Sequence, residues 1–94
     1  MMDDISYAVS LYRQLHEYPE LAYDLPLTLA LVKGELDRWG IPYSEAYGPS
    51  SIVATINPDC TGFTIGLRAD MDALPIEEKT CLSFSSKQIG RAHV

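Results

Sequence analysis

The amino-acid sequence predicts an α/β fold, on the strength of three observations. Apolar residues recur at helical spacing in two early segments, and later they alternate with polar residues in the period of a strand. Proline, glycine, asparagine and aspartate residues mark the turns between these segments. No internal repeat or low-complexity stretch interrupts them. We therefore expect two helices followed by strands.

A first helix is expected from about residue 4 to residue 17. Asp3 and Asp4 favour its N-terminus, because their carboxylates accept hydrogen bonds from free backbone N–H groups. His16 falls in the last turn, where the helix dipole favours it, and we expect a packing or hydrogen-bonding role. The helix presents one apolar face, formed by Ile5, Ala8, Val9, Tyr12 and Leu15.

A second helix is expected to begin at Pro26, because proline suits the first helical position. It should end near Trp39, where Gly40 provides the usual stop. Its apolar face comprises Leu29, Val32, Leu36 and Trp39. Pro19 and Glu20 are expected to shape the turn between the two helices.

Three strands are expected to follow, over residues 41–43, 51–56 and 61–68. The sequence Gly48-Pro49-Ser50 predicts a turn before the second strand. The sequence Asn57-Pro58-Asp59 predicts the turn that joins the second strand to the third.

Two carboxylates, Asp70 and Asp72, follow the last predicted strand at a spacing of i, i+2. Open α/β sheets build their sites at the carboxyl ends of strands, and both side chains would emerge on one side of the strand's extension. Two oxygen ligands this close suit a divalent cation, or one ligand and a carboxylate that orients a neighbouring ligand. A solvated turn or the cap of a following helix explains the same spacing, so both interpretations stay open.

Two motifs together resemble those of a family of metal-dependent amidohydrolases and peptidases. Residues 12–23 read YRQLHEYPELAY, and residues 67–78 read LRADMDALPIEE, followed by Thr80, Phe84 and Ser86. The family includes hippurate hydrolase, N-acyl-L-amino-acid amidohydrolases and the indole-acetyl-amino-acid hydrolases of plants. The resemblance implies the amino-terminal part of a zinc-peptidase-like catalytic domain, with two helices followed by strands of a mixed central sheet. The domain would be incomplete.

A third motif of the family is missing. In the family, the segment around Ser86 and Lys87 leads within a few residues into His-Ala-Cys-Gly-His-Asp, whereas this chain reads QIGRAHV from Gln88 onward. Residues 89–94 match the translated start of a widely used sequencing adapter. We therefore expect residues 1–88 to be native catalytic-domain sequence and residues 89–94 to be a foreign tail. His93 is given no role.

For the parent enzyme, the resemblance implies hydrolysis of the amide bond of an N-acyl amino acid, or of a related small amide or peptide. A pair of divalent metal ions, such as zinc or manganese, would serve as cofactor. Asp72 matches an aspartate that lies beside the metals and orients a ligand, and Asp70 stands where wider relatives carry a ligating histidine. Asp70 is therefore expected to support the ligands or to bind metal weakly. The family's other ligands lie downstream, so we expect the 94-residue chain alone to be inactive and to hold no complete metal site.

Three other charged residues of the second motif are expected to be structural. Arg68 would pair with Asp70, Asp72 or a glutamate on a helix, in preference to a substrate carboxylate. Glu77 and Glu78 are adjacent on an extended segment and would point opposite ways, so neither is assigned a catalytic role.

Composition limits the partners of the chain. The net charge of −6 argues against nucleic acid, and 47% hydrophobic residues exclude a disordered polar tail. No secretory signal or membrane-length apolar run is present, so we expect a cytoplasmic protein without a membrane partner. Cys60 and Cys81 are then expected to be free thiols. A homodimer stays open for the parent.

Two alternatives remain. An Asp-x-Asp sequence after a strand also begins phosphotransferases that use an aspartyl nucleophile and magnesium, but those carry Thr or Val where this chain has Leu74. The other alternative is a non-catalytic fragment, or a small acidic interaction protein, that associates through exposed strand edges.

Overall fold

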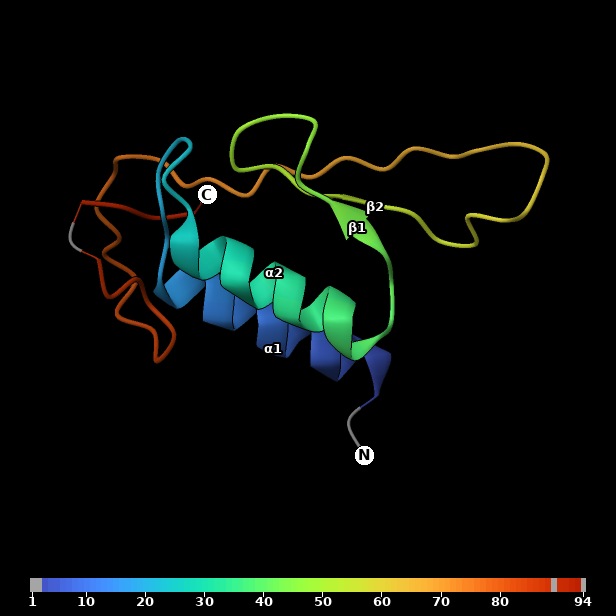
Figure 1. Cartoon of the computed structure of the whole chain (residues 1–94). Coiled ribbons are helices and arrows are strands. Elements are labelled where there is room, and N and C mark those ends of the chain that lie inside the picture. The colour runs from blue at the N-terminus through green and yellow to red at the C-terminus, as the bar shows by residue number, and fades with distance from the viewer. Residues whose placement is uncertain (1–2, 89, 94) are drawn as a thin grey trace.

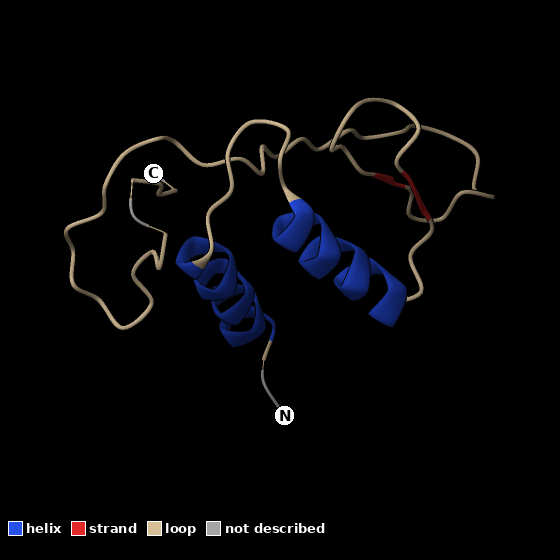
Figure 2. Cartoon of the chain, turned by 60° about the vertical axis from the view of Figure 1, so that its left-hand side comes forward, coloured by secondary structure: helices blue, strands red, loops and turns tan. Residues whose placement is uncertain are grey.

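The structure is a computed structural model that describes residues 3–88 and 90–93 (Figure 1). Two helices, α1 (Asp4–Glu17) and α2 (Pro26–Arg38), lie side by side and run in opposite directions (Figures 1 and 2). A short antiparallel pair, β1 (Tyr43–Ser44) and β2 (Val53–Ala54), follows them. This order confirms the predicted α/β class, and both helices lie where the sequence places them.

Helix α1 begins with a side-chain cap. The Ser6 N–H donates to Asp3 Oδ1 at 2.7 Å, which satisfies one of the backbone donors that a helix leaves free at its N-terminus. The same hydrogen bond holds the pKa of the Asp3 carboxyl below its usual value. The sequence-based prediction of this cap is therefore confirmed.

Helix α2 ends at Arg38, close to the expected end at Trp39, and Gly40 provides the stop that the sequence predicts. Gly40 adopts a φ of +66°, a left-handed conformation that costs glycine little. The Gly40 N–H donates to the Asp37 carbonyl at 3.1 Å, and the Ile41 N–H donates to the Leu36 carbonyl at 2.9 Å. This pair of bonds forms a Schellman motif, which satisfies carbonyls that the helix end would leave free.

The two helices contact each other at the start of α1 and the end of α2. The Tyr7 hydroxyl hydrogen-bonds Glu35, and Arg38 donates to the Tyr7 hydroxyl at 3.0 Å. The Trp39 ring meets the Tyr7 ring edge to face, with 6.0 Å between centroids.

The strands are much shorter than predicted. The strand expected over residues 41–43 is Tyr43–Ser44, and the one expected over residues 51–56 is Val53–Ala54. The strand expected over residues 61–68 is not formed, and that prediction is wrong. A strand exists only where a neighbour accepts its hydrogen bonds, and no described residue pairs with this segment. It projects away from the helices and returns above them, coloured yellow to orange in Figure 1.

The turns lie where the sequence predicts them. Cys60 N–H donates to the Asn57 carbonyl at 3.1 Å across the turn after β2, and Ser51 Oγ donates to the Gly48 carbonyl at 2.9 Å before it. Cys60 and Cys81 are both exposed, free thiols.

Burial is concentrated where the turn between the helices meets the acidic motif. Pro19 is fully buried, Leu25 and Ala73 are each 4% exposed, and Ala92 is 3% exposed. The Ala92 backbone pairs with Leu74, so residues 90–93 also pack against this region. Over the residues that the structure describes, no helix is both long enough and apolar enough to cross a bilayer.

Candidate functional site

Asp70 and Asp72 lie on the unpaired segment of chain that leads directly to the buried residue Ala73. Both carboxylates are exposed, and both line an open cleft of about 710 Å³. The lining of this cleft also includes Tyr23, from the turn before α2, and Ile52, which precedes β2. The two aspartates therefore face a shared, solvent-filled space.

Asp70 forms an ion pair with Arg68. Arg68 Nη2 lies 2.9 Å from Asp70 Oδ1, and both side chains are largely exposed. The prediction that Arg68 pairs with a neighbouring carboxylate is confirmed. Exposed pairs of this kind add little stability, because water screens them, so this ion pair does not fix the segment.

The residues that the structure describes do not form a metal site by themselves. Among residues 3–88 and 90–93, no three His, Cys, Asp or Glu side chains come together in a way that could hold a metal ion. Asp70 and Asp72 offer two carboxylates, and a zinc or di-metal site needs further nitrogen, sulfur or oxygen ligands. The metal role of these aspartates therefore stays a prediction.

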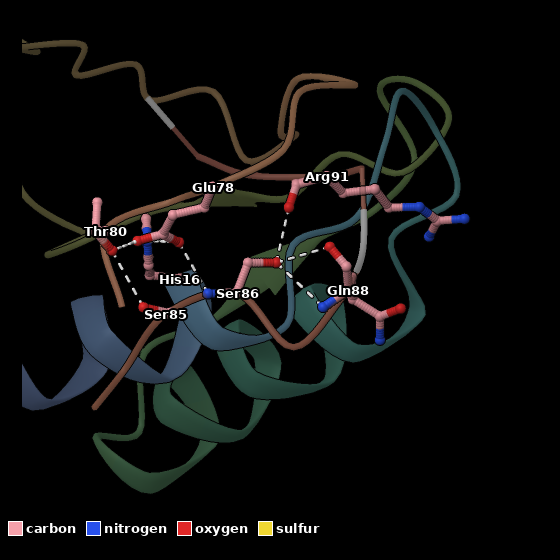
Figure 3. A network of polar contacts seen from close by, with 7 residues as sticks. All are labelled: His16, Glu78, Thr80, Ser85, Ser86, Gln88 and Arg91. Carbon is pink, nitrogen blue, oxygen red and sulfur yellow. Dashed lines mark hydrogen bonds and ion pairs between the residues drawn. The ribbon is translucent and has the colours of Figure 1, made fainter. Parts of the chain in front are cut away.

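The structure does build a polar centre around Glu78, shown in Figure 3. His16 Nε2 lies 2.7 Å from Glu78 Oε1, and the Ser86 N–H donates to the same oxygen at 2.8 Å. The Thr80 hydroxyl donates to Glu78 Oε2 and also lies 3.1 Å from Ser85 Oγ. Because a carboxylate only accepts, His16 must carry a proton on Nε2 to make this contact. The prediction that His16 is a hydrogen-bonding residue is confirmed.

These contacts stabilise the charged form of Glu78. The hydrogen bond from Thr80 lowers the pKa of the Glu78 carboxyl most, and the bond from the Ser86 N–H adds to this. Burial acts in the opposite direction, and His16 lowers the pKa further, so the net result is below the usual value. Glu77 is exposed and makes no hydrogen bond to this centre within the described part of the chain, so the two adjacent glutamates have different surroundings.

A second carboxylate, Glu20, caps helix α2. Its Oε2 accepts from the Leu27 N–H at 3.0 Å, and its Oε1 accepts from the Thr28 N–H at 2.6 Å. Burial raises the pKa of the Glu20 carboxyl, but the hydrogen bonds from Thr28 and Leu27 outweigh this and hold it below the usual value. Leu25, the residue at the cap position, contributes no side-chain hydrogen bond, so Glu20 takes over that role from five residues earlier in the chain.

An apolar cavity of about 560 Å³ separates the helix pair from the strand segments. Two buried polar atoms, His16 Nδ1 and Thr28 Oγ1, have no hydrogen-bond partner within the described part of the chain, and both residues line this cavity. Apolar side chains make up most of its wall, including Leu15, Val32, Leu36 and Met71. The helix layer and the strand layer are thus not closely packed together here.

Sequence reasoning missed the role of Glu78 and the capping role of Glu20. Glu20 lies in the first motif, and its carboxylate binds backbone N–H groups at the start of α2. Glu78 lies in the second motif, and its carboxylate binds a side chain of the first motif. His16 in the first motif and Glu78 in the second form such a pair, 62 residues apart. His93, which was given no role, lies with Nε2 3.4 Å from the Met71 carbonyl oxygen.

Comparison with known proteins gives related hydrolases. The chain is 44% identical over 86 residues to thermostable carboxypeptidase 1 of Saccharolobus solfataricus, covering 90% of this chain and 22% of that protein. It is 40% identical over 80 residues to hippurate hydrolase of Campylobacter jejuni, covering 85% of this chain and 21% of that protein. It is 37% identical over 91 residues to an IAA-amino acid hydrolase of Arabidopsis thaliana, covering 97% of this chain and 21% of that protein. A search against protein-family models gave no match.

A solved structure agrees with these relatives. The chain superimposes with a TM-score of 0.82 and 34% identity on a Bacillus subtilis dinuclear metal-binding peptidase of the M20 family. The match covers 97% of this chain and 26% of that one. The resemblance inferred from the two motifs is therefore confirmed, and the fold is that of the amino-terminal part of such a peptidase domain. The chain spans about a fifth of the length of the curated relatives it matches.

Proposed function

We propose that this chain, which is similar to the amino-terminal part of M20 metal-dependent amidohydrolases and peptidases, comes from an enzyme that cleaves the amide bond of N-acyl amino acids. The observation that carries the proposal is the structural match to a dinuclear metal-binding peptidase over 97% of the chain. The names of the relatives support the substrate class, since they include hydrolases of hippurate and of IAA-amino acids.

In this proposal, Asp72 orients a metal ligand, and Asp70 supports the site or binds metal weakly. Their position in the lining of the cleft of about 710 Å³ favours this, because further ligands could enter the same space. The remaining ligands, and with them the metal pair, would come from outside the residues present here. We therefore propose no activity for the 94-residue chain alone.

The proposal is tested with the complete coding sequence. The full-length protein should release free amino acid from N-acetyl amino acids or hippurate when Zn²⁺ or Mn²⁺ is supplied, and EDTA should abolish the release. Asp72→Asn should lower kcat/KM by about a hundredfold, as loss of a partner behind a metal ligand does. Asp59→Asn is the matched control, because it makes the same chemical change in the exposed turn after β2.

Two results would contradict the proposal. If the full-length protein hydrolyses none of these amides with any divalent metal, N-acyl amino acids are not its substrates. Equal kcat/KM for Asp72→Asn and Asp59→Asn would remove Asp72 from the site while leaving the enzyme class intact.

For the 94-residue chain itself, a second role is favoured by one observation. Phe63, Ile65 and Leu67 are 106%, 84% and 96% exposed, on a segment whose backbone forms no hydrogen bonds with other described residues. Such an edge can pair with another chain. We propose that the isolated chain associates with itself through residues 61–69 and has no catalytic role.

A further inference from the structure

Within the described part of the chain, the acidic segment is held by few contacts of its own. From residue 61 to residue 72, the described structure contains no hydrogen bond between two backbone groups, although the Met71 carbonyl oxygen lies 3.4 Å from His93 Nε2. Among the described residues, the Asp70 carboxylate pairs only with the exposed side chain of Arg68. An unpaired segment of this length samples many conformations. Whatever fixes the direction of Asp70 and Asp72 must therefore act at the points where the chain is next held.

The first such point is Ala73, directly after Asp72. The Ala73 N–H donates to the Glu20 carbonyl at 2.7 Å, and Leu21 and Ala73 form a parallel bridge. The side chain of Glu20 accepts two N–H bonds from the first turn of α2, as described above. Glu20 thus ties the residue after Asp72 to the start of α2, through its backbone and its carboxylate together.

The second point is Glu78, five residues later in the chain. Figure 3 shows its carboxylate between His16 at the end of α1 and the Ser86 backbone. The side chains of His16 and Glu78 are 11% and 8% exposed, so water competes little for this contact. The Lys87 N–H donates to the Glu17 carbonyl at 2.8 Å, so the loop from Glu78 to Lys87 closes onto the end of α1.

We propose that His16 and Glu20 are positioning residues, which hold the chain at Glu78 and Ala73 and thereby set where Asp70 and Asp72 emerge. Neither residue would touch substrate or metal. Residues that place a ligand must hold it to about 0.5 Å. Two anchor points, one tied to the end of α1 and the other to the start of α2, restrict both the position and the direction of the segment before them. That this placement serves a metal site rests on the proposed function. That His16 and Glu20 fix the position of the acidic segment does not.

The segment over residues 90–93 offers a competing explanation. Leu74 and Ala92 exchange two backbone hydrogen bonds, at 2.9 and 3.0 Å, and this pairing also lies close to Ala73. If residues 89–94 are foreign, this contact is absent from the parent. A chain that ends at Gln88 separates the two explanations, because it keeps His16, Glu20, Ala73 and Glu78.

The test measures distances between pairs of nitroxide spin labels in the 94-residue chain by pulsed electron paramagnetic resonance. The labelled chain is diluted with excess unlabelled chain, so that only distances within one molecule are measured. Cys60 and Cys81, which are exposed, are first replaced by serine. A reporter pair on Asp37→Cys and Ala69→Cys measures where the acidic segment lies relative to α2. A control pair on Gln14→Cys and Asp37→Cys measures the arrangement of the two helices. All three labelled positions are exposed.

His16→Ala should roughly double the width of the reporter distance distribution, because the segment then loses its anchor point at Glu78. Glu20→Ala should have a similar effect, because the Glu20 carbonyl that holds Ala73 is then no longer tied to the first turn of α2 by the carboxylate. The control distribution should stay unchanged. His16→Gln should restore the narrow reporter distribution, since its amide N–H still donates to Glu78. Truncation after Gln88 should also leave the reporter distribution narrow.

Three results would overturn the proposal. An unchanged reporter distribution in both alanine variants would show that these residues do not position the segment. Equal broadening of reporter and control would show that they hold the helices together instead. A truncation that broadens the reporter as much as His16→Ala would assign the placement to residues 89–94. None of these measurements involves metal or hydrolysis, so the enzyme assay can succeed or fail independently.

Discussion

Glu78 connects parts of the chain that are far apart in sequence. Its carboxylate is bound by a histidine of α1, a threonine two residues on and a backbone N–H eight residues on. A buried carboxylate with several donors is stabilised in its charged form, which explains its lowered pKa. This residue therefore makes the contact between α1 and the loop that follows the acidic motif dependent on pH.

The sign of that dependence follows from the lowered pKa. The folded-state pKa of Glu78 lies below its ordinary value of 4.5, so its contribution to stability is present above about pH 4.5 and is lost as pH falls through the folded value. The Ser86 amide resonance should therefore titrate with a midpoint below 4.5 in an NMR titration from pH 6 to 2. In Glu78→Gln that titration should vanish. A midpoint at or above 4.5, or an unchanged titration in the variant, would contradict this explanation.

Glu20 gives a second prediction at a single residue. Glu20→Ala removes both acceptors from the first turn of α2, and loss of a helix cap costs about 1 kcal/mol. Amide exchange at Thr28 should accelerate by about fivefold, while Glu20→Gln, which keeps one acceptor oxygen, should fall between. Asp24→Ala in the same turn is the control, because it is exposed. Equal acceleration in Asp24→Ala would show that Glu20 has no special role in capping.

Among the elements, the helices were predictable and the strands were not. Asp3, Pro26 and Gly40 are local signals, and each produces its expected cap or turn within a few residues. The alternation at Phe63, Ile65 and Leu67 indicates a strand, but a strand also requires a partner. No described residue supplies that partner, so the alternating sequence is present but the strand does not form.

The same residues give a prediction about association. Ile65→Lys places a charge in the exposed apolar segment, and charges on an open edge oppose pairing with another chain. The variant should show a lower weight-average mass than the unchanged chain in light scattering at equal concentration. Ile5→Lys is the matched control, because Ile5 is also exposed but lies on α1. Similar masses for Ile65→Lys and the unchanged chain would exclude residues 61–69 as the site of association.

The candidate site was only partly predictable, for a related reason. The acidic pair, the pairing of Arg68 and the hydrogen bonding of His16 follow from residue type and spacing. The contact between His16 and Glu78 joins residues 62 positions apart, and only the folded chain brings them together. Glu20 was expected in the turn, but its capping role depends on the turn folding back to present its carboxylate to Leu27 and Thr28.

At the scale of the whole molecule, the chain is less compact than a domain of its length. Its radius of gyration is 15.1 Å, whereas a compact domain of 94 residues has about 12 Å. Its accessible surface is 7522 Å², whereas a compact protein of 10.4 kDa exposes about 5,400 Å². The apolar surfaces on the strand segments and in the cavity beside the helices are therefore suited to contact further protein.

This shape leads to a prediction for the isolated chain. It should bind the dye ANS strongly while it shows a substantial helical far-UV circular dichroism signal, because the helices have local caps while the apolar strand segments lack a partner. The full-length protein should bind little ANS under the same conditions. Weak ANS binding together with the helical far-UV signal would show that the 94-residue chain forms a close-packed domain alone.

The central claim is that this chain is the opening part of a metal-dependent amidohydrolase, and the coding sequence tests it most directly. Reading the source DNA without interruption beyond Lys87 should reveal His-Ala-Cys-Gly-His-Asp within a few codons, in place of residues 89–94. That result would supply the missing ligand motif and identify the tail as foreign. A genomic stop codon directly after Val94 would contradict the claim and leave a small acidic protein without a catalytic site.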